Sequence, residues 1–223
     1  MLKPAFLVSL LAALTLAAAL LTLNVLRPGP DNGRIEAACG VGGAFGELRW
    51  EPERIPLQVL VDESAGDWTG AILDAAKAWN VAAGREVLRV EPAAPTSWVD
   101  FADALAGTGP EPVGRVLFYG GDNLALSGPK SLAVDDEDAV ARLRWRLGAC
   151  TIGYAIVRLR ASPEPFAPEA MREVALHELG HVLGLAHDGL TRSVMVRRVR
   201  APEPGEPRFP HEITAKDAAI VAQ

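Results

Sequence analysis

Apolar residues recur with a helical period in one stretch of the first half of the chain. Apolar positions three or four residues apart predict a helix over residues 68–83 with one buried face. Asp67 stands where an N-terminal cap is favoured, and Gly84 stands where helices commonly end. The apolar positions are Ile72, Ala75, Ala76 and Trp79.

Two further helices are predicted in the last third of the chain. One begins near Pro168, because proline suits the first turn of a helix, and runs to about residue 183. The other covers residues 214–222, where the hydroxyl of Thr214 can cap the first turn. Asp217 follows three positions later, as in a capping box.

Four short apolar runs, rich in β-branched residues, predict strands. Residues 91–112 contain several prolines and little periodicity, so we expect a loop there, with at most a short strand at residues 98–101. Strands, a helix, more strands and a second long helix predict an α+β domain with a twisted sheet packed against two long helices. The predicted strands cover residues 56–61, 87–90, 113–119 and 151–159.

The N-terminal segment predicts export. Residues 5–26 contain no charged residue, and this length is enough to span a bilayer as a helix. Lys3 precedes the segment, so the N-terminus should stay in the cytoplasm and the remainder should face the periplasm or the exterior. Two interpretations stay open: an uncleaved membrane anchor at residues 1–27, or a signal peptide cleaved near the small residues at 17–19.

Composition limits the domain organisation and the partners. After a linker at residues 28–48, residues 49–223 are long enough for one well-packed domain. The 223-residue chain has a net charge of −6 and no basic tract, so nucleic acid is not an expected partner. Arg142, Arg144 and Arg146 alternate with apolar residues and predict a short strand or helix with one solvated face. The oligomeric state is not set by these features.

The residues from His177 to His187 carry the motif H-E-x-x-H-x-x-G-x-x-H, and three of the four histidines of the chain lie in it. On a helix, His177 and His181 share a face, so both imidazoles can bind one ion. Gly184 permits the tight turn that brings His187 to the same ion. Three imidazole ligands leave one coordination position open, as in catalytic zinc sites.

This motif predicts a zinc-dependent endopeptidase with one catalytic zinc ion and with proteins or peptides as substrates. Glu178 follows His177 on the helix and can act as the general base on the water that attacks the peptide carbonyl. Neither a nucleophilic side chain nor a covalent intermediate is needed. Two other functions stay open: a catalytically silent module that keeps the zinc-binding fold and binds a protein partner, and a zinc hydrolase of small amides.

The chain resembles the metzincin metallopeptidases and, within them, the matrixin branch (peptidase family M10). Met195 follows the motif at the distance of the metzincin methionine turn, and residues 175–181 and 213–217 look like matrixin sequences. The resemblance implies a metzincin-like zincin fold for residues 49–223, a twisted mixed β-sheet packed on two long helices plus a C-terminal helix. Asp188 departs from the serine usual in matrixins and is the residue of the adamalysin branch.

The resemblance also implies roles for single residues. Met195 should form an apolar floor beneath the histidines rather than bind the metal. An edge strand before the motif helix should bind the substrate as an extended peptide. The segment after Met195 should line the pocket beyond the scissile bond, and its arginines suggest the hypothesis of a preference for acidic side chains. These are Arg197, Arg198 and Arg200.

Matrixins often bind a structural zinc ion and calcium ions as well. No histidine precedes His177, which excludes a structural zinc site built from histidines before the motif. The acidic residues at 135–138 offer oxygen ligands for calcium, but they lack the spacing of a calcium loop, so we interpret them as a solvated turn. His211, the fourth histidine, is assigned to a surface or capping role.

Cys39 and Cys150 leave three interpretations open. An even number of cysteines in an exported protein favours a disulfide between them. The sequence Cys-Gly-Val at Cys39 is also similar to that of latent matrixins, in which the cysteine occupies the open position on the zinc. The residues that flank this latency signal are absent here. Two free thiols are the third interpretation.

Overall fold

The chain divides into two units, residues 1–42 and residues 43–223. The computed structural model describes residues of the second unit only: 49–121, 139–146, 151–160, 167–187, 192–196 and 212–222. Within these residues no helix is both long enough and apolar enough to cross a membrane. The predicted anchor or signal peptide, the linker, Cys39 and Cys150 lie outside the described residues.

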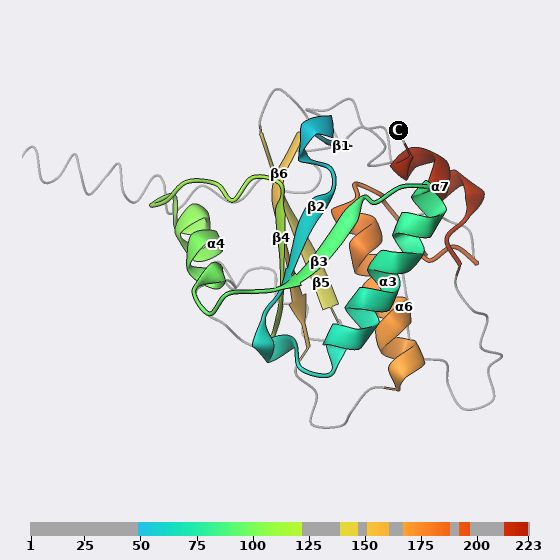
Figure 1. The fold of residues 1–223 in the computed structure, drawn as a ribbon, viewed down its shortest axis with the longest axis horizontal. Coiled ribbons are helices and arrows are strands. Elements are labelled where there is room, and N and C mark those ends of the chain that lie inside the picture. Colours follow the sequence, from blue (N-terminus) through green and yellow to red (C-terminus); the bar gives the residue numbers. More distant parts are fainter. Residues whose placement is uncertain are drawn as a thin grey trace, which may run out of the picture. The chain divides into compact units, whose positions relative to one another are not determined.

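A six-stranded mixed sheet forms the centre of the described domain (Figure 1). Its strands are β1 (Arg49–Trp50), β2 (Leu57–Val61), β3 (Leu88–Pro92), β4 (Arg115–Gly120), β5 (Ala139–Arg146) and β6 (Thr151–Leu159). Strands β3, β2, β4 and β6 are neighbours in that order and run parallel. The two-residue strand β1 pairs in parallel with the start of β6, and β5 pairs antiparallel with β6. The four predicted strands are confirmed, with ends shifted by up to two residues.

β5 contains the alternating arginines, for which the sequence left a strand or a helix open. Its register places Arg142 opposite Ile156 and Arg144 opposite Tyr154 on β6. Arg144 is exposed, whereas Arg142 is partly buried. The segment is therefore a strand, and of the predicted solvated face only the exposure of Arg144 is confirmed. Among the described residues β5 pairs with β6 alone, so it lies at an edge of the sheet.

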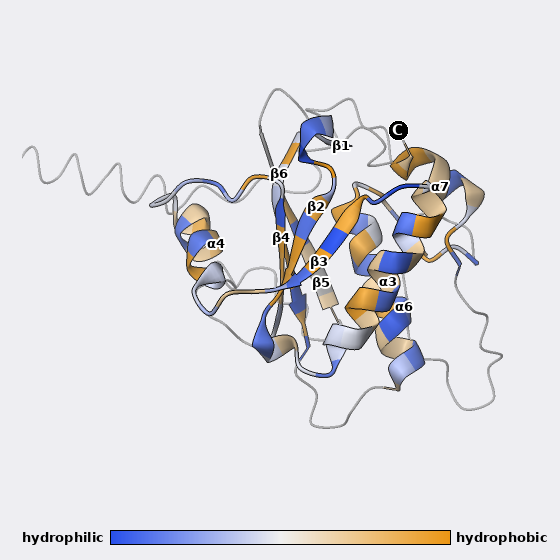
Figure 2. Cartoon of the chain, in the orientation of Figure 1, coloured by the Kyte–Doolittle hydropathy of each residue, from blue (hydrophilic) through white to orange (hydrophobic). Residues whose placement is uncertain are grey.

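Two long helices pack against each other beside one face of the sheet (Figure 1). They are α3 (Trp68–Ala83) and α6 (Pro168–Val182), and both agree with the predicted helices. The short helix α7 (Ala215–Val221) contacts α3. Figure 2 shows hydrophobic and hydrophilic positions alternating along α3, as the amphipathic pattern requires. The predicted α+β architecture is confirmed.

The predicted helix caps are confirmed with one exception. Gly84 ends α3 in the left-handed conformation, at φ 67°, and Thr214 and Asp217 form the capping box of α7. The prediction that Asp67 caps α3 through its side chain is wrong. Asp67 precedes the helix but already has helical backbone angles, and its carboxylate accepts no capping hydrogen bond. The backbone and hydroxyl of Thr69 donate instead to the carbonyl of Gly66.

The prediction of a loop, with at most a short strand, within residues 91–112 is also wrong. A helix, α4 (Ser97–Ala106), follows β3 and lies on the opposite side of the sheet from α3 and α6 (Figure 1). Phe101 is fully buried there, and its ring meets that of Tyr154 edge-on at 5.8 Å between centroids. Burial of this apolar face against the sheet stabilises the helix, whereas the prolines on either side of it made the sequence pattern favour a loop.

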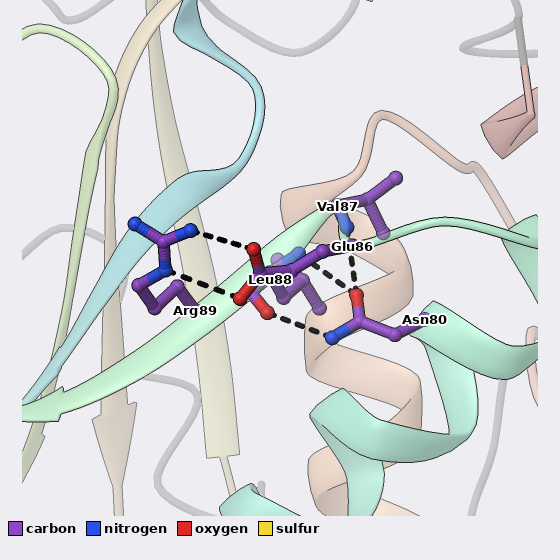
Figure 3. A network of polar contacts seen from close by, with 5 residues as sticks. All are labelled: Asn80, Glu86, Val87, Leu88 and Arg89. Carbon is purple, nitrogen blue, oxygen red and sulfur yellow. Dashed lines mark hydrogen bonds and ion pairs between the residues drawn. The ribbon is translucent and has the colours of Figure 1, made fainter.

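A side chain of α3 protects the other edge of the sheet at β3 (Figure 3). The amide oxygen of Asn80 accepts hydrogen bonds from the backbone N–H groups of Val87 and Leu88, at 2.8 and 2.9 Å. Its amide nitrogen donates to the carbonyl oxygen of Leu88 at 2.8 Å. The primary amide thus takes the place that a further strand would occupy, which blocks pairing at this point of the edge.

Candidate metal centre

The middle of α6 is buried, because this helix contacts both α3 and β5. Residues 174–180 are all buried and include His177 and Glu178. Gly180 permits the close packing behind them. A methyl group at this position would collide with Sδ of Met195 and would lie 3.1 Å from the ring of Trp79. The backbone of the motif helix is therefore fixed from behind by two large buried side chains.

The end of α6 forms a Schellman motif centred on Gly184. Gly184 has a φ of 93°, and its backbone N–H donates to the carbonyl of His181 at 2.9 Å. The N–H of Leu185 donates to the carbonyl of Gly180 at 3.0 Å. This pair of hydrogen bonds defines the Schellman turn and reverses the chain after the helix. The turn brings His187 back toward the two histidines of α6, as the motif predicted.

The three histidines point their Nε2 atoms at one another. Nε2 of His181 lies 3.0 Å from that of His177 and 3.2 Å from that of His187, and the third separation is 3.2 Å. Imidazole nitrogens about 2.0–2.1 Å from a tetrahedral zinc ion lie about 3.3 Å apart, so this triangle fits one such ion. Among the described residues these three form a group that can hold a metal ion.

The Nδ1 atoms of two histidines are held by backbone carbonyls. Nδ1 of His177 lies 2.7 Å from the carbonyl oxygen of Val194, and Nδ1 of His181 lies 2.9 Å from that of Leu185. A carbonyl can only accept, so each Nδ1 carries the proton and donates it. The Nε2 lone pairs are then free to face a metal ion, which is the tautomer and orientation that metal-binding histidines require.

The environment of His181 favours its neutral form. Burial, together with the smaller effects of the neighbouring imidazoles of His177 and His187, lowers the pKa of His181 to about 3. The hydrogen bond to the carbonyl of Leu185 opposes this shift. An imidazole that stays neutral can bind a metal without first losing a proton. A neutral His181 also does not repel the positive charge of a metal ion.

A known protein family shares the sequence pattern of this chain. The matrixin family model matches residues 60–222, which is well over half of the chain. The chain belongs to the matrixin family. No curated protein matches it. Matrixins are zinc-dependent metallopeptidases. The resemblance to matrixins and the fold class predicted from the sequence are both confirmed.

The methionine turn of this matrixin lies where the sequence predicted it. Met195 is fully buried and packs against Gly180 of α6, so it contributes to an apolar support behind the histidines. Its neighbour Val194 supplies the carbonyl that accepts from Nδ1 of His177. The turn therefore supports the site in two ways, through packing and through one hydrogen bond to a predicted ligand.

Sequence reasoning missed the residues that hold this turn. The hydroxyl of Ser193 accepts from the backbone N–H of Met195 at 2.9 Å and donates to Oδ2 of Asp217 at 3.3 Å. The same carboxylate oxygen accepts from the backbone N–H and the hydroxyl of Thr214. The capping-box signal identified Asp217 as part of a helix start, but nothing local to it pointed to Ser193.

Several predicted features lie outside the described residues, so their predictions stay open. They are Asp188, the acidic residues at 135–138, Arg197, Arg198, Arg200, His211, Cys39 and Cys150. The four predicted site residues, His177, Glu178, His181 and His187, are all described. The structure brings the three histidines together and buries Glu178 in α6 beside the first of them.

Proposed function

We propose that this matrixin is a zinc-dependent endopeptidase whose single catalytic zinc ion is held by His177, His181 and His187. The observation that carries the proposal is the triangle of Nε2 atoms, with sides of 3.0 to 3.2 Å, on the motif helix and its turn. Three neutral imidazoles leave one position for the reacting groups, as catalytic zinc sites require. Calcium is not part of this proposal.

Glu178 is the proposed general base. A bound zinc ion would supply a Lewis acid that polarises the scissile carbonyl and lowers the pKa of water. The carboxylate of Glu178 takes the proton of the attacking water and then passes it to the leaving amide nitrogen. Its side chain is buried, with 6% of the residue exposed, which limits competing solvation of the carboxylate. Glu178 thus carries the proton from the attacking water to the leaving nitrogen.

We infer that the substrate binds as an extended strand along β5. This strand pairs on one side only among the described residues, and α6 contacts it directly. An extended peptide adds to such an edge through backbone hydrogen bonds. The opposite edge, at β3, is obstructed by the amide of Asn80. The two edges therefore differ in their ability to accept a peptide, and β5 is the one beside the motif helix.

We also propose that residues 49–223 act outside the cytoplasm, either tethered by residues 1–27 or released after cleavage of that segment. The uncharged run at residues 5–26 supports export in both cases. N-terminal sequencing of the membrane and soluble fractions distinguishes the two. A chain that begins at Met1 and stays with the membrane indicates an anchor, and a shortened soluble chain indicates cleavage.

The proposed function is tested with the purified full-length chain. We expect elemental analysis to find about one zinc ion per chain. We also expect the chain to cleave internal peptide bonds of unfolded casein. His177→Ala, His181→Ala and His187→Ala should each lower the zinc content, with Lys216→Ala, an exposed residue, as the control. Zinc without cleavage of proteins would favour the silent binding module, and cleavage of short amides alone would favour the small-amide hydrolase.

A further inference from the structure

An indole from the start of the domain donates a hydrogen bond to the end of the motif helix. Nε1 of Trp50, on β1, lies 2.7 Å from the carbonyl oxygen of Val182, the last residue of α6. The two residues are 132 positions apart, and 6% of Trp50 is exposed. A short hydrogen bond in a buried setting is stronger than its solvated counterpart, because water does not compete for the carbonyl.

This bond completes the end of α6. The last carbonyls of a helix have no partners within the helix. The Schellman turn supplies partners for the carbonyls of Gly180 and His181, through the N–H groups of Leu185 and Gly184. The carbonyl of Val182 is not one of the two that this motif satisfies, and the indole N–H of Trp50 is its donor. Turn and indole together hold three consecutive carbonyls.

The same turn determines where two of the histidines point. Leu185, whose N–H closes the turn, uses its carbonyl to accept from Nδ1 of His181 at 2.9 Å. His187 follows only two residues later and meets the other imidazoles at 3.2 Å. A shift of the backbone at Val182 would therefore move both the hydrogen-bond partner of His181 and the imidazole of His187.

We propose that Trp50 is a positioning residue of the metal centre, which it serves by fixing the turn that carries His187. The inference rests on the proposed function, since it assumes that the three histidines hold the zinc ion. Trp50 precedes the region that the matrixin model matches, residues 60–222, so this contribution comes from outside the matched part of the domain. Hydrogen bonds that orient metal ligands commonly change metal affinity by about 10–100-fold.

The test is the zinc affinity of the full-length chain, measured by competition with a chromophoric chelator. Trp50→Phe keeps an aromatic ring and removes the N–H donor, and we expect it to weaken zinc binding about tenfold. The control is Phe101→Leu, which loosens the core on the opposite side of the sheet. Zinc affinity unchanged in Trp50→Phe, or weakened equally in a Phe101→Leu chain with the same loss of melting temperature, overturns the proposal.

A double-mutant cycle identifies the route of the effect. If Trp50 acts through His187, Trp50→Phe should weaken zinc binding about tenfold in the wild type but by less than about twofold in a His187→Ala chain. An equal effect in both backgrounds contradicts the proposed route through the turn that carries His187. The absorption spectrum of the cobalt-substituted protein should also change in Trp50→Phe and stay unchanged in Phe101→Leu, because only the first alters the geometry of the ligands.

A measurement on the unaltered chain covers the case in which Trp50→Phe fails to fold. Coupling is reciprocal, so a bond that favours zinc binding must itself be favoured by zinc. The indole N–H of Trp50 should exchange with solvent more slowly after zinc is added, and an unchanged rate overturns the proposal. A wild-type chain that binds no zinc overturns the proposed function too, whereas zinc binding that ignores Trp50 overturns this inference alone.

Discussion

The hydroxyl of Ser193 donates to the buried carboxylate of Asp217 and thereby joins the methionine turn to the start of α7. Ser193 also accepts from the backbone of Met195, and the residue between them presents its carbonyl to His177. A helix that lies after the motif in sequence thus holds the segment that orients the first histidine. The stability of the C-terminal helix and the geometry of the metal centre should therefore be linked.

Replacing Asp217 with alanine should weaken both the fold and the site. The substitution leaves the N–H of Thr214 and the hydroxyl of Ser193 without their acceptor, and we expect a loss of about 1–3 kcal/mol in the free energy of unfolding. Zinc affinity should fall as well, because Val194 would no longer hold His177 firmly. Urea unfolding and zinc competition measure the two effects, with the exposed neighbour change Lys216→Ala as control. Wild-type zinc affinity in Asp217→Ala would break the proposed link.

Gly180→Ala should destabilise the domain by about 1–3 kcal/mol, although alanine normally favours a helix, because the new methyl group collides with Sδ of Met195. The matched control is Gly70→Ala in α3. A methyl group there meets no atom within 4 Å, and helix propensity predicts a gain of about 0.5–1 kcal/mol. Thermal unfolding of both variants checks the prediction. A Gly180→Ala chain as stable as Gly70→Ala would show that the helix tolerates a wider separation from the methionine turn.

Asn80→Ala should expose the edge of β3. The change removes three hydrogen bonds to Val87 and Leu88, so we expect about 1–3 kcal/mol less stability. The uncovered backbone groups should also promote pairing between chains. Light scattering at increasing concentration measures self-association, and Lys77→Ala, exposed on the same helix, is the control. An Asn80→Ala chain that scatters light no more than this control would mean that the amide does not guard the edge.

The metal-free chain should lose stability as the pH falls below about 6.5. Its folded state keeps His181 neutral down to about pH 3, whereas the unfolded chain takes up this proton near the ordinary pKa of 6.5. The unfolded state then binds more protons, so acid favours it, by about 2 kcal/mol at pH 5 from this residue. Urea unfolding of the wild type and of His181→Gln at pH 7.5 and pH 5 checks the sign. Equal pH dependence in the two chains contradicts it.

The motif helix and its ligands could be predicted because their signals are local. The four-residue spacing of His177 and His181 fixes a shared helix face, and Gly184 marks the turn. The capping box at Thr214 is equally local. These features need only the geometry of one turn of helix, which the sequence displays directly.

The remaining features depend on contacts between distant segments. α4 forms because Phe101 is buried against β6, and no periodicity within its proline-flanked stretch revealed that face. The bond from Trp50 to Val182 joins residues 132 positions apart, and Ser193 meets Asp217 across 24 positions. Such pairs follow from tertiary packing, so a single sequence identifies the ligands of the site better than the residues that hold them.

The most direct test of the central claim compares the wild type with Glu178→Gln after both have been loaded with zinc. The substitution keeps the size of the side chain and all three histidines, so each chain should hold one zinc ion. We expect Glu178→Gln to cleave unfolded casein about 10²–10⁴-fold more slowly, which is the contribution of a general base. Equal rates at equal zinc content, or a zinc-loaded wild type that cleaves no protein, would contradict the account.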